Sequence, residues 1–270
     1  MTYFGFLVVF LVSPILALTG LLYYRRRSGL GSALGGRAAV LAVAVHMLLA
    51  LVYTTPWDNY LVATGVWYYD PAHVTGVVLG YVPLEEYVFF LLESLLVGLW
   101  WIALRPSSGP ARPFKSHAGL RKSLSAVALL IWAVSTVALF CSWTPGTYLT
   151  LILSWVLVPI GIQLAFGSDL LWHYRRLVAG TILPVALYLS VADSIAIKTG
   201  IWAISEAQTT GLHLFGLPLE EGLFFLATAT VLGFGMTLAL VPEGQERLAL
   251  LARKLGPRRF VDRAGLDRQK

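Results

Sequence analysis

Residues 80–90 read GYVPLEEYVFF, and residues 215–225 read FGLPLEEGLFF. The pattern P-L-E-E-x-x-F-F therefore occurs twice, 135 positions apart in a chain of 270 residues. In each copy two neighbouring carboxylates precede two phenylalanines within a strongly apolar stretch. The fold and the chemistry of the chain can be inferred from where these acids lie and why they occur twice.

The composition indicates that the chain lies in a lipid bilayer. Charged residues make up 13% of the chain and hydrophobic residues 57%, with a mean hydropathy of +0.74. Ordinary soluble domains are roughly a quarter charged. Seven apolar runs reach the length of about 20 residues that a membrane-spanning helix needs. They cover approximately residues 3–24, 37–55, 80–104, 123–141, 147–168, 176–197 and 216–240. The sequence therefore predicts an all-α integral membrane protein with seven transmembrane helices.

Basic residues between the runs predict the orientation. They follow the first, third and fifth runs, whereas the loops on the opposite side contain only Lys198. The positive-inside rule then places the N-terminus outside and the C-terminus inside a cell membrane. This orientation accounts for the net charge of +6 without a nucleic-acid partner. The basic residues on the predicted inner side are Arg25, Arg26, Arg27, Arg37, Arg105, Arg112, Lys115, Arg121, Lys122, Arg175 and Arg176.

An internal repeat predicts how the helices are organised. When the chain is shifted by 135 residues, 17 of the 46 positions from Tyr53 to Gly98 match those from Tyr188 to Gly233. Chance would give about four matches in a sequence of this composition. Each unit holds three helices, so two units share one orientation only if a single extra helix separates them. The run at 123–141 is that helix, and the predicted architecture is 3+1+3 with parallel repeats.

Four segments follow from this organisation. Residues 1–104 form the first three-helix unit, and residues 143–240 form the second. Residues 105–142 contain a basic loop, interpreted as a flexible joint, and the linker helix. Residues 241–270 form a basic tail, predicted to lie in the cytosol beside the anionic lipid headgroups of the membrane.

The paired glutamates are the main candidates for function. Proline at the first helical position and glutamate in the first turn are typical of a helix start, which explains one such pair. It does not explain two pairs with matched phenylalanines, aspartates and tryptophans. Ionisable groups within a membrane are costly and are functional candidates by default. The candidate acid-base set is therefore Glu85, Glu86, Glu220 and Glu221, with Asp58 and Asp193 as residues that orient them.

A further acid distinguishes the two units. Glu93 lies seven residues after Glu86, which places it on nearly the same helical stripe and about 10 Å deeper in the membrane. Its counterpart in the second unit is Thr228. Glu93 is thus either a member of the catalytic set or a partner in a hydrogen bond between helices.

The doubled motif at the start of two membrane helices resembles the membrane-integral lycopene cyclase family. Members occur as two small subunits in some bacteria and as one fused chain elsewhere, and this chain is similar to the fused form. The resemblance covers nearly the whole chain except the tail. It implies a lycopene β-cyclase that closes the acyclic ends of lycopene, or of a related acyclic carotenoid, into β-ionone rings, giving γ-carotene and then β-carotene. It also implies contact with other membrane enzymes of carotenoid biosynthesis.

The chemistry of ring closure suits these residues. It adds a proton to a terminal double bond, passes through a carbocation and loses a proton, without electron transfer. Two adjacent carboxyl groups have different pKa values, because like charges resist joint ionisation. One carboxyl group can therefore donate a proton while the other accepts one. Aromatic rings present negative π faces to a cation and exclude water. The candidate rings are Trp67, Trp202, Phe89, Phe90, Phe224 and Phe225.

The sequence predicts no cofactor and no metal site. It contains one cysteine, Cys141, and its five histidines share no metal-ligand spacing.

A small proton-coupled transporter with the same 3+1+3 plan is the alternative function. Within the cyclase hypothesis, the residues leave open which glutamate of each pair is the acid. They also leave open whether each unit closes one end or both units form one site.

Overall fold

A computed structural model shows seven helices long and apolar enough to span a membrane within the residues it describes, which are 1–28, 36–105, 113–141 and 143–255. The prediction of an all-α membrane protein is thereby confirmed. The first span consists of α1 (Tyr3–Leu7), a π-helical segment (Val8–Val12) and α2 (Ser13–Arg27). The remaining spans are α3 (Gly36–Ala63), α4 (Leu84–Leu104), α5 (Ala118–Phe140), α6 (Thr147–His173), α7 (Arg175–Lys198) and α8 (Leu219–Leu240). A further helix, α9 (Pro242–Leu255), follows α8.

Several predicted helix boundaries were wrong by a few residues. Helix α3 continues eight residues beyond the apolar run that ended at 55, because its last two turns carry polar side chains that the protein buries. Helices α4 and α8 begin about four residues later than predicted, because the residues before them form hairpins. Helix α5 begins at Ala118, inside the predicted joint. Part of that joint, residues 106–112 with Arg112, lies outside the described residues, as do residues 256–270 of the tail.

Short strands close one end of the helix bundle. Strands β2 (Val78–Leu79) and β3 (Val82–Pro83) form a hairpin before α4, and β5 (His213–Leu214) and β6 (Leu217–Pro218) form one before α8. Strand β1 (Trp67–Tyr69) pairs in antiparallel fashion with β4 (Trp202–Ile204), so it joins the two halves of the sequence. Short 3₁₀ turns at Thr144–Gly146 and Glu206–Gln208 complete this end.

Glycines explain part of the sequence match between the halves. Gly65 and Gly200 have φ angles of +68° and +72°, and Gly76 and Gly211 have φ angles of +82° and +74°. Residues with a Cβ atom rarely adopt positive φ, so the loops between the spans require glycine at these matched places.

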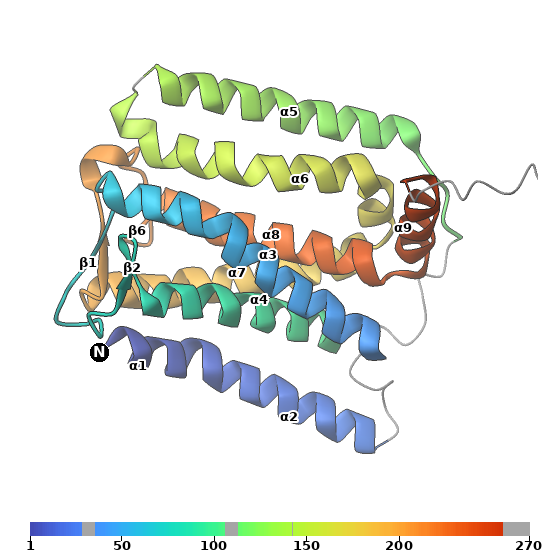
Figure 1. The fold of residues 1–270 in the computed structure, drawn as a ribbon, viewed down its shortest axis with the longest axis horizontal. Coiled ribbons are helices and arrows are strands. Elements are labelled where there is room, and N and C mark those ends of the chain that lie inside the picture. Colours follow the sequence, from blue (N-terminus) through green and yellow to red (C-terminus); the bar gives the residue numbers. More distant parts are fainter. Residues whose placement is uncertain (29–35, 106–112, 142, 256–270) are drawn as a thin grey trace, which may run out of the picture.

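Helices α4 and α8, which carry the acidic pairs, occupy the centre of the bundle (Figure 1). In the most apolar window of α8 61% of the residues are buried, and in that of α4 50% are, against 11% for α5. Helix α5 lies at the periphery beside α6, and α2 lies at the opposite edge (Figure 1). The glutamates at the starts of α4 and α8 therefore lie at one end of the bundle, shielded by the other helices.

Equivalent contacts occur at residues matched by the repeat. The hydroxyl of Tyr53 on α3 donates to the carbonyl of Trp155 on α6 at 2.8 Å. Its counterpart Tyr188 on α7 donates to the carbonyl of Phe10 on the first span at 2.9 Å. Trp155 follows Phe10 by 145 positions, so the first and fifth spans match with a shift ten residues longer than the rest.

An aspartate joins several segments at the end of the bundle opposite the acidic pairs. The carboxylate of Asp169 on α6 binds Arg247 of α9 through two bonds of 2.8 and 3.0 Å. It also binds Arg121 of α5 at 2.6 Å and the amide of His117 at 3.1 Å. Asp169 is buried, so its negative charge is balanced by two guanidinium groups instead of water.

We expect Asp169→Ala to lower stability by about 3 kcal/mol, because it leaves two partly buried arginines without their partner. The apparent midpoint of thermal unfolding in detergent should fall by several degrees. The conversion Glu246→Gln on the exposed side of α9 is the matched control and should leave that midpoint unchanged. Equal midpoints for wild type and Asp169→Ala would show that the ion pairs do not stabilise the bundle.

Candidate active site

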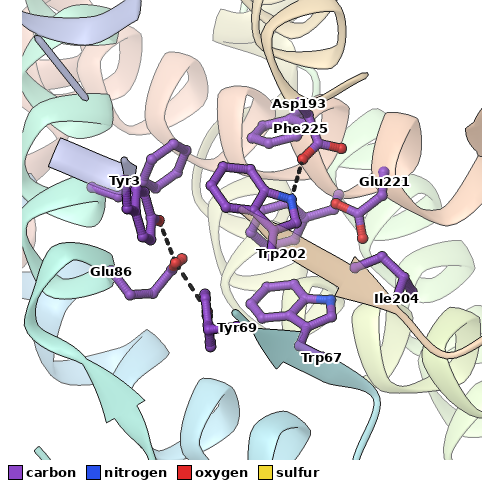
Figure 2. A pocket seen from close by; sticks show the side chains of 11 residues that line it. Tyr3, Trp67, Tyr69, Glu86, Asp193, Trp202, Ile204, Glu221 and Phe225 are labelled. Carbon is purple, nitrogen blue, oxygen red and sulfur yellow. Dashed lines mark hydrogen bonds between the residues drawn. The ribbon is translucent and has the colours of Figure 1, made fainter. Parts of the chain in front are cut away.

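A small cavity lies between the β1 and β4 strands and the first turns of α4 and α8 (Figure 2). We call it the central cavity; its volume is about 30 Å³. Glu86 from the first acidic pair and Glu221 from the second both line it. The remaining lining residues are Tyr3, Trp67, Tyr69, Phe89, Asp193, Trp202, Ile204, Phe224 and Phe225.

Glu86 accepts hydrogen bonds from two tyrosines. The hydroxyls of Tyr3 and Tyr69 both donate to its Oε2 atom, the latter at 3.0 Å (Figure 2). Burial first, and then the nearby charge of Glu86, raise the pKa of Tyr69 well above its usual range, so this hydroxyl keeps its proton and remains a donor. Two hydroxyl donors on one oxygen stabilise negative charge there.

Glu221 has different surroundings. Asp193, Tyr148 and Trp67 lie next to its carboxyl group, but its Oε1 atom has no hydrogen-bond partner among the described residues. The indole of Trp202 donates to Oδ1 of Asp193 at 2.8 Å (Figure 2). A second carboxyl group thus lies beside Glu221. Two like charges so close in an apolar site disfavour joint ionisation.

The first glutamate of each pair binds the preceding loop instead. Oε1 of Glu85 accepts from the amide of Thr75 at 2.7 Å. Oε1 of Glu220 accepts from the amide and the hydroxyl of Thr210, each at 2.7 Å. Neither Glu85 nor Glu220 lines the central cavity. The geometry therefore separates the two glutamates of each pair, with one toward the loop and one toward the cavity.

Aromatic rings form most of the cavity wall. The ring of Trp202 lies 4.9 Å from that of Tyr3, and the ring of Trp67 lies 5.6 Å from that of Phe224. Phe89 and Phe225 approach each other at 6.3 Å across α4 and α8. Five of the six aromatic residues that the sequence predicts thus lie together. Phe90 does not line this cavity, and lines a separate one further along the helices.

Besides Glu85 and Glu220, two further predicted acids lie outside the cavity lining. Asp58 is fully buried, yet neither of its oxygens forms a hydrogen bond with any residue that the structure describes. Glu93 accepts a hydrogen bond of 2.7 Å from Thr228, its counterpart in the repeat, so the two halves meet directly at this pair. The interhelical hydrogen bond considered for Glu93 is therefore present.

Three tyrosines of the site, Tyr3, Tyr69 and Tyr148, were not predicted from the sequence. Tyr3 binds Glu86, and Tyr148 lies beside Glu221. These two tyrosines match at the shift of 145 residues, as Thr2 matches Thr147 and Pro14 matches Pro159. A search that allowed one gap between the first two spans would have found them. Tyr69 has no such signal, because its counterpart is Ile204.

The fold and the cavity together define a class: a helical membrane protein with two opposed carboxyl groups in an aromatic site. Comparison with known proteins gives the family, since the family model described as "Lycopene cyclase" matches residues 1–102 and 145–239. The chain belongs to the lycopene cyclase family. No solved structure matches it.

The relatives agree with this assignment. The chain is 39% identical over 240 residues to a lycopene beta-cyclase of Halobacterium salinarum, covering 88% of this chain and 95% of that protein. It is 34% identical over 212 residues to a bifunctional lycopene cyclase/phytoene synthase of Pyrenophora tritici-repentis, covering 73% of this chain. That match covers 35% of the longer protein. A protein of the same description from Phaeosphaeria nodorum is 34% identical over 205 residues, covering 69% of this chain and 34% of that protein.

We expect Glu85→Ala to loosen the loop before α4, because Thr75 loses its carboxyl hydrogen-bond acceptor. A hydrogen bond contributes about 0.5–1.5 kcal/mol net, so amide exchange in residues 70–79 should accelerate by about threefold or more. Hydrogen-deuterium exchange followed by mass spectrometry measures this. Glu86→Ala is the control, since its side chain binds no amide of that loop. Equal exchange in the two variants would contradict the division of roles.

Proposed function

We propose that the chain converts the acyclic ends of lycopene into β-ionone rings, giving γ-carotene and then β-carotene. The observation that carries this proposal is that Glu86 and Glu221, one from each acidic pair, face the same aromatic cavity. Membership of the lycopene cyclase family, and the name of the relative in Halobacterium salinarum, support the choice of substrate. They also favour this function over a proton-coupled transporter.

In the proposed reaction one carboxyl group donates a proton and another accepts one. Glu221 in its neutral form protonates the terminal double bond of the acyclic end, which leaves a tertiary carbocation. The neighbouring double bond attacks this cation and closes the six-membered ring. The Glu86 carboxylate then removes a proton next to the new cation and leaves the ring alkene. No electron is transferred, and the proton lost balances the proton gained.

The surroundings of the two glutamates support this assignment. The hydroxyls of Tyr3 and Tyr69 favour the ionised form of Glu86, as a base requires. Glu221 lies beside Asp193, and its Oε1 has no partner in the described part of the chain. A neutral carboxyl group avoids the repulsion between the two acids. Glu85 and Glu220 act as positioning residues through the loops they bind.

The aromatic wall suits a carbocation. The faces of Trp67, Trp202 and Phe224 carry negative charge density that attracts a cation without reacting as a nucleophile. They also keep out water, which would capture the cation as an alcohol. Because the volume of the central cavity is only about 30 Å³, the lining side chains must move when an end group enters.

We expect Glu86→Gln and Glu221→Gln each to abolish the formation of both rings. A general acid or base contributes about 10²–10⁴-fold, so either variant should leave lycopene unconverted in a bacterium that accumulates it. One shared site predicts no build-up of the one-ring product in either variant. Two independent sites predict that each variant stops at that one-ring product. Chromatography of the extracted pigments distinguishes these results.

The control variants for this experiment come from the same helices. Glu85→Gln keeps an oxygen that accepts from Thr75 and should retain most activity. Tyr69→Phe removes one of two donors to Glu86 and should lower the rate by about tenfold, since a hydrogen bond to a charged group contributes about 1.5–3 kcal/mol. Full activity in both Glu86→Gln and Glu221→Gln, with normal amounts of inserted protein, would refute the mechanism.

We further propose that the seven spans are two parallel three-helix units, residues 1–104 and 143–240, with a joining segment at 105–142 and a tail at 241–270. The matched bonds of Tyr53 and Tyr188 support the repeat. The distribution of arginine and lysine supports an outer N-terminus and an inner tail in the cell membrane. The relatives whose names join a lycopene cyclase with a phytoene synthase support contact with other membrane enzymes of carotenoid biosynthesis.

The cysteine Cys141 offers a direct test of this orientation. It is exposed at the end of α5 that the proposed topology places outside the cell. We expect a membrane-impermeant maleimide to label it in intact cells, because the chain contains no other cysteine. Cys141→Ser should abolish labelling, and Arg253→Cys in that background should be labelled only after the cells are permeabilised. The reverse pattern would invert the topology.

A further inference from the structure

A second, larger cavity lies between α3, α4, α6 and α8, further along the helices than the acidic pairs. We call it the lateral groove; its volume is about 280 Å³. Apolar side chains such as Ala50, Trp155, Ile162 and Val231 form most of its lining. Glu93 and Thr228 also line it, but they are bonded to each other, which reduces the cost of the carboxyl group in an apolar space.

The lateral groove is continuous with the aromatic wall of the central cavity. Phe224 lines both spaces. Its ring stacks on Trp57 at 5.8 Å, and Trp57 stacks on Trp155 of the groove at 4.4 Å. Phe224 and Trp57 each also meet Trp67 of the central cavity edge to face. A row of aromatic rings thus leads from the groove to the paired carboxyl groups.

The mouth of the groove faces the hydrocarbon of the bilayer. Leu49 is 57% exposed and Ile162 is 67% exposed, and both lie on helices that span the membrane. An apolar molecule dissolved in the bilayer reaches such an opening sideways, without passing through water.

The repeat supplies a natural comparison. A counterpart groove of about 410 Å³ lies between α2, α4 and α7. Its residues Val185 and Tyr188 match Ala50 and Tyr53 of the lateral groove at the shift of 135, and Ala17 matches Ile162 at the shift of 145. The counterpart groove shares no lining residue with the central cavity. Size therefore does not explain why only one groove would bind substrate. The difference is that the lateral groove shares Phe224 with the central cavity.

We propose that the lateral groove binds the conjugated polyene chain of the substrate, while the end group being closed occupies the central cavity. This proposal rests on the proposed function. A polyene is straight, flat and apolar, so it gains dispersion contacts along the aromatic row and needs no polar partner. Glu93 then lies beside the chain as a bonded wall residue and takes no part in proton transfer. The counterpart groove contacts lipid only.

The same substitution in each groove tests this proposal. Ala50→Trp fills the lateral groove, and Ala17→Trp fills the counterpart groove. We expect Ala50→Trp to lower the initial rate of lycopene conversion by at least about tenfold, and Ala17→Trp to stay within about twofold of wild type. Lycopene retained by purified Glu86→Gln protein should fall in the same way when Ala50→Trp is added and remain when Ala17→Trp is added.

Both variants must be inserted in the membrane at wild-type levels. If Ala50→Trp does not fold, Ile162→Trp at the exposed mouth replaces it and should have the same effect. Equal rates and equal retention for the two alanine variants, in a protein whose wild type makes rings, would overturn the groove proposal alone. A wild-type protein that makes no rings would instead overturn the proposed function.

Discussion

The burial of carboxyl groups at the starts of α4 and α8 is the constraint on which the rest of the structure depends. Glu85, Glu86, Glu220 and Glu221 are each less than 10% exposed, in a bundle surrounded by lipid. A buried acid without partners is costly, so the protein provides donors from distant segments. Tyr3 from the first span donates to Glu86, and Thr75 and Thr210 from loops donate to Glu85 and Glu220. The segments that close this end of the bundle are thus the same ones that provide hydrogen bonds to the acids.

Glu86 and Glu221, which match in the sequence repeat, line the same cavity, but the side chains around them differ. Tyr69 donates to Glu86, whereas Ile204 occupies the matching place in the second half and has no donor to offer. Glu93 and Thr228 differ in the same way and bond across the two halves. An acid and a base need different proton affinities to act in sequence at one pH. In the proposed mechanism, Tyr69 gives Glu86 a donor that the second half does not supply at the matching place.

Much of the fold was predictable, because hydrophobic length and charge bias are local properties. Seven apolar runs gave the seven spans, and the paired acids with Trp67, Trp202, Phe89, Phe224 and Phe225 were recognisable from the repeat. The ends of helices were less predictable, as α3 shows. Its last turns carry Asp58, and only tertiary packing makes this polar side chain a buried helical residue. The sequence did not predict that Glu85 binds the preceding loop while Glu86 lines the cavity. The directions of neighbouring side chains in a first turn depend on the loops packed around them.

In the proposed reaction each ring closure moves one proton from Glu221 to Glu86, which fixes what must happen before the next one. The two carboxyl groups must exchange their protonation states again, but no net proton is consumed. The proposed reaction meets this need if the proton returns across the cavity itself. Both glutamates line the central cavity, whose volume is about 30 Å³. In this proposal the return takes place after the ring end has left. Exclusion of water during ring closure and proton return afterwards then depend on the same small space.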